Sequence, residues 1–243
     1  MEPEISVIYC TARQGGLDIL KESMEQQTFK EFEVLVLDEL HRTSGFIDIT
    51  PPKKKDGMFW NLSASLNEGV RHAKGELIVL LQDYIKVPPD GLQKFWNRHL
   101  QEPKGLISGV GDQFDAKTGV CTFADPRKQD VNNHGFYLGI SLLWEANWGC
   151  FPRQAWVDVG GFDERYDSGW GYDNTDFAER CGIAGYHTFL DTDNEVYCIS
   201  HIKLFNEQGI RDKAPNNMKL YQKLSRDWYK GQEPWKLNYA SPL

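Results

Sequence analysis

Asp83 and His201 are side chains suited to hard divalent metal ions, and each lies just after an apolar run. Such ions prefer carboxylate oxygens, often with an imidazole, and phosphates of a bound ligand complete their coordination. The pattern therefore predicts that Asp83 and His201 hold a hard divalent metal ion beside a phosphate-bearing ligand. Two simpler interpretations stay open, because Asp83 can be a solvated strand end and a lone His is more often structural.

A second polar group consists of Asp173, Asn174 and Asp176, at the start of a predicted helix. Carboxylates in this position often cap the helix and interact favourably with its dipole. The functional interpretation is a general base that the preceding Gly-Trp-Gly turn presents to a pocket. Trp170 in that turn would offer a flat face to a sugar ring, although such aromatic residues usually belong to the core.

Hydrophobic spacing predicts the elements that position these residues. Short apolar runs at 5–10, 33–37 and 78–81 indicate buried strands, and apolar residues three or four apart indicate helices between them. Strands that alternate with helices form a mostly parallel sheet, whose carboxyl ends meet at one edge. We therefore expect the polar residues after these strands to share a ligand-binding edge: Thr11, Arg13, Asp38, Gln82 and Asp83.

The second half of the chain is richer in aromatic residues and less regular. The predicted strands there cover 106–111, 120–123, 187–190 and 195–200, and the predicted helices cover 177–183 and 218–229. No repeat or low-complexity tract interrupts the chain, so we expect one continuous α/β domain over residues 1–243.

Composition excludes several classes of protein. A net charge of −8 over 243 residues gives no general attraction to nucleic acid or anionic membranes. The five Cys are scattered without a CxxC pair, which argues against zinc or a disulfide framework. The first residues lack the features of a signal peptide, and no apolar run approaches the ~20 residues of a membrane span. We expect a soluble, cytoplasmic protein. Dinucleotide-binding, P-loop and GxSxG hydrolase motifs are absent from the sequence.

Taken together, the order and spacing of several segments resemble family-2-type glycosyltransferases with the GT-A fold. The similar segments are 5–13, 33–38, 65–76, 75–84, 160–164 and 169–176. The resemblance implies a Rossmann-like, mostly parallel sheet flanked by helices, with a smaller antiparallel portion on the acceptor side. It divides the chain into a nucleotide-sugar-binding half (1–104), an acceptor and catalytic half (105–205), and a lid segment with a C-terminal helix (206–243).

The resemblance also implies roles for individual residues. Thr11, Arg13 and Asp38 would hold the base and ribose of a nucleotide sugar, and Asn67 would lie near its diphosphate. The segment Gln82-Asp83-Tyr84 falls on the metal motif of the family and His201 on its late metal-binding His, so the resemblance implies Mn²⁺ or Mg²⁺ as the metal. Asp173 falls on the catalytic motif, with Asp176 in reserve, and Trp148 and Trp170 would contribute to an acceptor site.

Two departures from the family pattern affect the expected mechanism. The metal motif keeps only its middle carboxylate, Asp83, and Asn174 stands where some relatives carry the base. Asn cannot accept a proton, so the predicted base is Asp173.

The expected activity is inverting transfer of a sugar from a nucleotide sugar, UDP-linked in the simplest case, to an acceptor hydroxyl. The sequence does not decide whether the acceptor is a saccharide, a peptide or a nucleic-acid base. The alternatives are a non-catalytic nucleotide-sugar or glycan-binding protein on the same fold and, with a poorer match after the first strand, a nucleotidyltransferase.

Overall fold

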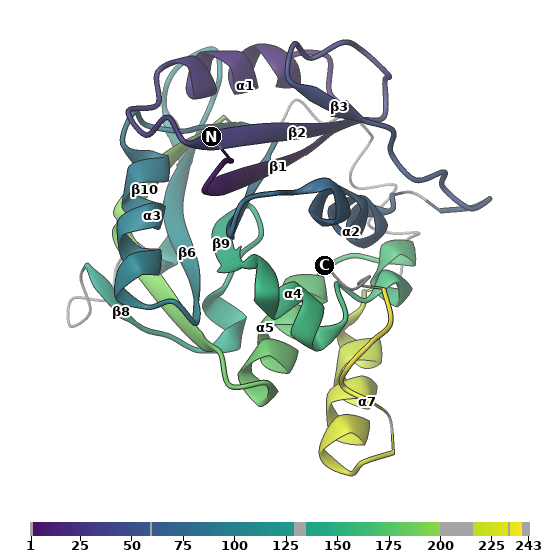
Figure 1. Ribbon diagram of the computed structural model, residues 1–243. Helices are drawn as coiled ribbons and strands as arrows, with labels where there is room; N and C mark the ends of the chain where they lie inside the picture. The colour runs from purple at the N-terminus through teal and green to yellow at the C-terminus, as the bar shows by residue number, and fades with distance from the viewer. Residues whose placement is uncertain (1, 59, 129–134, 200–215, 233, 240–243) are drawn as a thin grey trace.

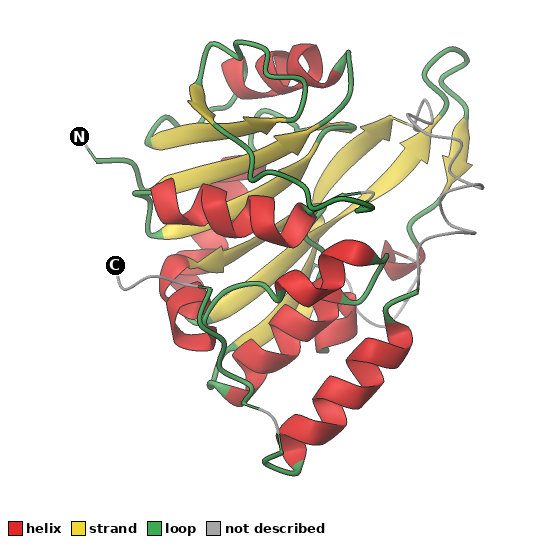
Figure 2. Cartoon of the chain, turned by 90° about the vertical axis from the view of Figure 1, so that its right-hand side faces the viewer, coloured by secondary structure: helices red, strands yellow, loops and turns green. Residues whose placement is uncertain are grey.

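A single mixed sheet with helices on both faces forms the framework of the protein (Figures 1 and 2). The computed structural model describes residues 2–58, 60–128, 135–199, 216–232 and 234–239. The strands are β1 (Ile5–Thr11), β2 (Phe32–Asp38), β3 (Ile47–Ile49), β4 (Leu77–Gln82), β5 (Ile85–Lys86), β6 (Gly105–Phe114), β7 (Cys121–Phe123), β8 (Phe136–Leu138), β9 (Trp148–Pro152) and β10 (His187–Ile199). The α-helices are α1 (Gly16–Glu25), α2 (Leu62–His72), α3 (Gly91–Gln101), α4 (Arg153–Val159), α5 (Asp173–Ile183) and α7 (Met218–Tyr229), and the short 3-10 helices are η1 (Pro126–Lys128), η2 (Ser141–Leu143) and η3 (Glu164–Ser168).

The order of the strands is β3-β2-β1-β4-β9-β6-β10-β5, with β7 beside β6 and β8 beside β10. The pairs β3–β2, β2–β1, β1–β4 and β6–β10 are parallel. The pairs that involve β9, β5, β7 and β8 are antiparallel. The mostly parallel α/β sheet expected from the sequence is therefore confirmed, with the antiparallel portion in the second half of the chain.

Alternate residues of the central strands enter two separate cores because successive side chains of a strand point to opposite faces. Val79 of β4 packs with Leu20 of α1 and Phe95 of α3 on one face. Leu80 of β4 packs with Leu66 of α2 on the other face, where α4 and α5 also lie. Burial on both faces explains why these strands are continuous apolar runs in the sequence.

The strand register brings the predicted polar ends to one edge of the sheet. Thr11 pairs with Asp38 across β1 and β2, and Cys10 pairs with Gln82 across β1 and β4. The residues that follow β4, beginning with Asp83, therefore lie at the same edge. This part of the expected geometry is confirmed.

Several predicted elements have different bounds in the structure. Helix α5 begins at Asp173, four residues before the predicted start at 177, and the predicted strands 187–190 and 195–200 are one strand, β10, with an irregular register between Leu190 and Glu195. Strand β9 was not predicted because its aromatic sequence, residues 148–152, carries no clear alternation. It inserts antiparallel between β4 and β6, so its pairing is a tertiary property.

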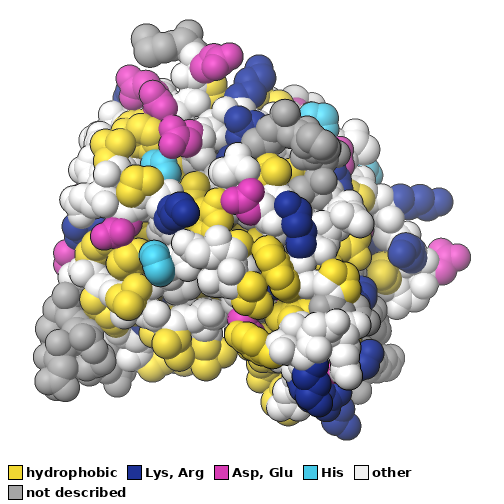
Figure 3. Space-filling model, turned by 60° about the horizontal axis from the view of Figure 1, so that its bottom comes forward, with side chains coloured by type: hydrophobic (Ala, Val, Ile, Leu, Met, Phe, Trp, Pro, Cys, Tyr) yellow, Lys and Arg dark blue, Asp and Glu magenta, His cyan; other side chains and the backbone are white. Residues whose placement is uncertain are grey.

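Side chains of both charges lie interspersed with hydrophobic ones on the face shown in Figure 3. None of the helices in the described part of the chain is long and apolar enough to cross a membrane.

Candidate functional site

Thr11, Arg13 and Asp83 form a polar cluster at the carboxyl ends of β1 and β4. The hydroxyl of Thr11 donates to Oδ2 of Asp83 at 3.0 Å, and Nε of Arg13 lies 3.1 Å from Oδ1. The guanidinium of Arg13 also lies over the ring of Tyr84, 5.3 Å from its centroid. The cluster thus combines a cation, a carboxylate and a hydroxyl at the edge where open α/β sheets bind ligands.

The start of α1 closely approaches this cluster and restricts the residue at Gly16. A Cβ at that position would lie 2.5 Å from Oγ1 of Thr11 and 3.3 Å from Cβ of Asp83. The carbonyl of Gly16 accepts a hydrogen bond of 2.6 Å from the hydroxyl of Tyr9. A glycine at this point therefore lets the helix start pack directly on Thr11 and Asp83.

Asp38 lies at the same edge, but its carboxylate is engaged by the loop that follows β2. Its oxygens accept hydrogen bonds from the amides of Leu40 and Arg42 and from the Arg42 side chain, the shortest being 2.7 Å. Burial opposes ionisation of Asp38, but these donors together hold its pKa below the usual value. Arg42 also donates to the carbonyls of Arg13 and Gln14, at 2.8 and 2.7 Å. The Asp38–Arg42 pair therefore fixes the backbone that carries Arg13.

A cavity of about 320 Å³, here called the first cavity, opens beside the polar cluster. Thr11, Arg13, Gln82 and Asp83 line one side of it, and Trp60 and Leu62 line it from the chain before and at the start of α2. Nε1 of Trp60 donates to the carbonyl of Gly169 at 2.7 Å, which ties this wall to the segment before α5. The sequence does not predict Trp60 as a site residue, because it lies in a stretch without hydrophobic periodicity.

A further cavity of about 320 Å³, the second cavity, lies on the other side of the β4–β5 turn. Tyr84 and Ile85 line it, whereas the preceding residues Gln82 and Asp83 line the first cavity. Its polar wall includes Arg127, Glu145 and Asn147, which the sequence did not single out. The two cavities thus share the turn that carries Asp83.

Glu145 links the second cavity to the start of α5. Its Oε2 accepts a hydrogen bond of 3.3 Å from Nδ2 of Asn174. Burial raises the pKa of Glu145, and the charge of Asp173 raises it further, while Arg127 opposes the shift. No local pattern in the sequence marks Glu145, because its partner is distant in the chain.

Asp173, the predicted base, is the first residue of α5 and is half-buried. Burial raises its pKa, while the amides of Asp173 and Asn174 oppose the increase. Gly171 and Tyr172 before it both have left-handed backbone conformations, with φ of 77° and 70°. For a non-glycine residue this conformation is uncommon, and Tyr172 is held in it with its ring stacked on Tyr221 of α7 at 5.2 Å.

Asp176, the reserve base, is fully buried in an ion pair with Arg180. Its Oδ2 lies 2.7 Å from Nε of Arg180, and its Oδ1 accepts a hydrogen bond of 3.0 Å from the hydroxyl of Tyr166. Burial raises the pKa of Asp176 to about 6, against the opposing charge of Arg180. Arg180 also donates to the carbonyls of Val159 and Gly161. The pair therefore joins α5 to the turn after α4.

Asn67 is also buried, and all four hydrogen-bonding positions of its amide are used within the protein. Its Nδ2 donates to the carbonyl of Phe162 and to Oε1 of Glu164, at 2.9 and 3.0 Å. Its Oδ1 accepts from Nε1 of Trp156 and from the amide of Phe162, at 2.9 and 2.8 Å. The expected contact with a diphosphate remains a prediction, but the side chain joins α2 to the 160–164 segment.

The two tryptophans predicted for an acceptor site differ in exposure. Trp148 is 2% exposed, and its ring packs against Phe95 with centroids 4.5 Å apart. Trp170 is 37% exposed, and its carbonyl accepts a hydrogen bond from the amide of Asn217. Trp170 is therefore the more exposed of the two, whereas Trp148 lies in the wall of the second cavity.

The predicted metal ligands are only partly within the described residues. Asp83 is described, whereas His201 lies outside the described residues. Among the residues that the structure describes, no group of three or more His, Cys, Asp or Glu side chains is arranged to hold a metal ion. Asp83 alone, paired with Arg13, does not make a complete ligand set.

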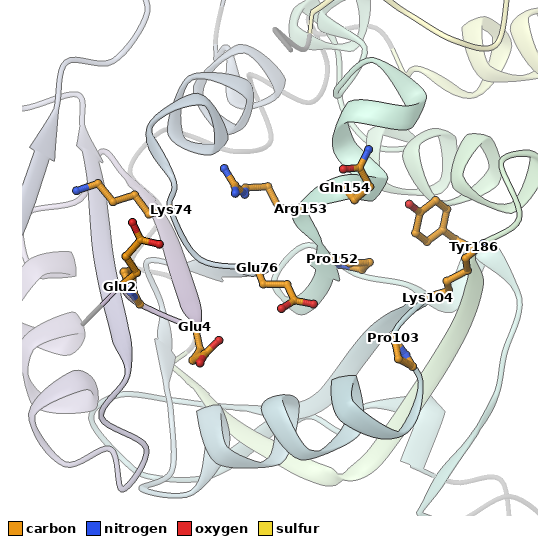
Figure 4. A pocket seen from close by; sticks show the side chains of 11 residues that line it. Glu2, Glu4, Lys74, Glu76, Pro103, Lys104, Pro152, Arg153, Gln154 and Tyr186 are labelled. Atoms are coloured by element: carbon orange, nitrogen blue, oxygen red, sulfur yellow. The ribbon is translucent and has the colours of Figure 1, made fainter. Parts of the chain in front are cut away.

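A larger cavity, of about 580 Å³, lies at the opposite edge of the sheet (Figure 4). Glu4 and Glu76 precede β1 and β4, and Lys104 precedes β6, so the amino ends of these strands border it. Figure 4 shows acidic and basic side chains around this cavity. Because ligands of open α/β sheets bind outside the carboxyl ends of the strands, the first cavity is the better candidate for a functional site despite its smaller volume.

Comparison with protein families finds no matching family, and comparison with curated protein sequences finds no match. Among solved structures, the fold is similar to that of GalNAc-T7 in complex with UDP, GalNAc and Mn²⁺, with a TM-score of 0.64 and 11% sequence identity. The similarity covers 83% of this chain and 45% of that chain. At this identity the similarity establishes the fold alone, which is the GT-A fold.

Proposed function

We propose that the protein is a glycosyltransferase of the family-2 type, which transfers a sugar from a nucleotide sugar to an acceptor hydroxyl. The observation that carries the proposal is the Thr11–Arg13–Asp83 cluster beside the first cavity, at the carboxyl ends of β1 and β4. The GT-A fold supports it, because a solved structure with this fold contains UDP, GalNAc and Mn²⁺. The donor proposed for this chain is a UDP-linked sugar.

The first cavity has the features needed for the nucleotide part of such a donor. The ring of Trp60 lines it and offers a surface for a base, and Arg13 supplies a positive charge for the diphosphate. The Asp38–Arg42 pair holds the Arg13 backbone, so in this proposal Asp38 supports the donor site through Arg42. The sugar would then lie near the β4–β5 turn, between the first and second cavities.

The proposed reaction is a single displacement that inverts the anomeric carbon. The acceptor oxygen attacks this carbon from the second cavity, on the face opposite the diphosphate, and a carboxylate accepts its proton. The carboxylate predicted from the sequence is Asp173. Trp170, which is partly exposed beside α5, is proposed to contact the acceptor.

A divalent cation remains a prediction for this site. Mn²⁺ or Mg²⁺ bound with the donor would neutralise charge on the diphosphate, and Asp83 and His201 are the ligands expected from the sequence. The described residues do not by themselves form a full set of ligands. Arg13 is the described positive group that lies next to Asp83 at this edge.

Binding of nucleotide sugars to the purified protein tests the proposal. A thermal-shift screen of UDP- and GDP-sugars, each with and without Mn²⁺, should raise Tm for one class of donor, because a ligand of the folded state stabilises it by mass action. Arg13→Ala should remove the shift, whereas exposed Glu25→Gln on α1 should keep it. Absence of any shift would contradict the proposed donor site.

Slow hydrolysis of the bound donor separates an enzyme from a binding protein. Two features of the sequence favour the binding-protein alternative: the metal motif keeps only its middle carboxylate, Asp83, and Asn174 stands where some relatives carry the base. A transferase should release nucleoside diphosphate from the donor in water, since water acts as a poor acceptor. Donor binding without any such release would favour the binding protein.

A further inference from the structure

Glu145 has a place in the site that the sequence motifs did not reveal. It lies between η2 and β9, lines the second cavity and is half-buried. Its Oε2 lies 3.3 Å from Nδ2 of Asn174, and its amide donates to Oγ of Ser108 at 3.2 Å. The backbone and the carboxylate of Glu145 are therefore both held in position at the wall of the cavity.

We propose that Glu145 accepts the proton of the incoming hydroxyl, and that it supplies from another part of the chain the carboxylate that the α5 motif lacks at Asn174. The proposal rests on the proposed glycosyl transfer and identifies its base. Asn174 would act as a positioning residue, because its amide donates to the carboxylate of Glu145 and orients it.

The other carboxylates near this cavity are less suitable for the role. Asp176 is fully buried in its ion pair with Arg180. Asp125 lines the second cavity, but its oxygens accept hydrogen bonds from the Arg127 side chain and the Gly111 amide, and although burial opposes the change, its pKa is lowered. Asp173 is not among the described residues that line the second cavity. Glu145 is thus the carboxylate with both access and a favourable environment.

The charged groups around Glu145 favour a base of increased strength. Burial raises the pKa of Glu145, and the charges of Asp173 and Asp125 act in the same direction. The charge of Arg127 and the hydrogen bond from Asn174 oppose this increase in the pKa. Tyr84 also lies within the electrostatic reach of Glu145. A carboxylate with a raised pKa accepts a proton more readily than one in water.

The reaction balances without a further reactant. As the acceptor oxygen forms its bond to the anomeric carbon, its proton passes to the carboxylate of Glu145. The bond between the anomeric carbon and the phosphate oxygen breaks at the same time, and its electron pair leaves with the nucleoside diphosphate. Glu145 later returns the proton to water, which restores the carboxylate.

Donor hydrolysis provides a test that needs no knowledge of the acceptor. With the nucleotide sugar that gives the largest thermal shift, Glu145→Gln should lower the rate of nucleoside diphosphate release about a hundredfold or more, with donor Kd unchanged. Glu25→Gln, at an exposed position on α1, provides the matched control. The wild-type rate should fall at low pH as Glu145 becomes protonated, and this decrease should be absent from Glu145→Gln.

Relocating the carboxylate distinguishes a base from a structural residue. Asn174→Asp in the Glu145→Gln background places a carboxylate on the other member of the hydrogen-bonded pair, and should restore at least a tenth of the rate together with its dependence on pH. A purely structural role for Glu145 would give no such rescue.

The outcomes separate this proposal from the proposed function. Hydrolysis by Glu145→Gln at the wild-type rate would overturn the role of Glu145 and leave glycosyl transfer intact. Loss of hydrolysis in Asp173→Asn would then assign the base to Asp173. If the wild-type protein itself showed no donor binding or no hydrolysis, both the proposed function and the role of Glu145 would be overturned. Restored hydrolysis in the double variant would support both.

Discussion

Nε of Arg13 lies 3.1 Å from Oδ1 of Asp83, so the loop after β1 and the turn after β4 are joined by a charged contact. The contact lies where successive residues of the β4–β5 turn divide the first cavity from the second. Removal of either partner removes this charged contact between the loop and the turn. The pair therefore holds together the edge at which the donor is proposed to bind.

Asp83→Ala should weaken donor binding and remove any effect of Mn²⁺ on it. We expect Kd to rise about tenfold or more, which corresponds to about 1.4 kcal/mol, because Arg13 and Thr11 lose the group that positions them. Isothermal titration calorimetry with and without Mn²⁺ measures both effects. An unchanged Kd in the presence of Mn²⁺ would argue against a metal role for Asp83.

Trp60→Leu should lower the affinity for the nucleotide by about 1 kcal/mol or more, because a base stacked on an aromatic ring loses that contact. Trp60→Phe keeps a ring and should retain most of the affinity. Trp170→Leu provides a contrast, since we expect it to affect transfer while donor Kd stays constant. Equal Kd values for Trp60→Leu and the wild type would remove Trp60 from the donor site.

The anomeric configuration of the first product tests the single displacement. Proton NMR during donor hydrolysis should show the sugar released with the configuration opposite to that of the donor, before mutarotation mixes the anomers. Retention of configuration would exclude a single displacement with one carboxylate as base.

Asp176→Ala should destabilise the fold strongly, because it leaves the buried charge of Arg180 without its partner. A loss of about 3–5 kcal/mol in the free energy of unfolding is expected for such a break. Urea denaturation followed by far-UV circular dichroism measures it, with Glu25→Gln as the control. A stable Asp176→Ala protein that no longer transfers sugar would instead point to a direct role in catalysis.

We expect Asp167 to make the stability of the protein depend on pH in a way that a surface carboxylate would not. Its oxygens accept hydrogen bonds from the amides of Ser63 and Ala64 at the start of α2, at 2.7 and 3.0 Å. Burial raises its pKa to about 7, although these amides oppose the increase. The folded state thus binds a proton more tightly than the unfolded chain, where the pKa is about 4. The contribution of Asp167 to stability should be present below pH 4 and should decrease as the pH rises to about 7.

Comparison of Tm across this range with Asp167→Asn isolates the effect. Between about pH 4 and pH 7, the change of Tm with pH should lack in this variant the part that the Asp167 carboxyl contributes. Identical slopes in the two proteins would show that Asp167 titrates as an ordinary carboxylate.

The sequence by itself determined the parallel part of the sheet and the edge at which its polar residues meet. Strands β1, β2 and β4 are buried on both faces, so they appear as continuous apolar runs, and the direction of parallel strands then fixes where Thr11, Asp38 and Asp83 must lie. This inference requires only local patterns and the handedness of strand connections.

Only the tertiary structure decided what the individual side chains contact. Asn67 is engaged by the 160–164 segment and Asp167 by the amides of Ser63 and Ala64, and hydrophobic spacing alone marked neither of these partners. Glu145 reaches Asn174 because β9 inserts antiparallel between β4 and β6 and brings the segment before it to the start of α5. Such contacts depend on how distant elements pack, and the pattern of any single segment does not encode them.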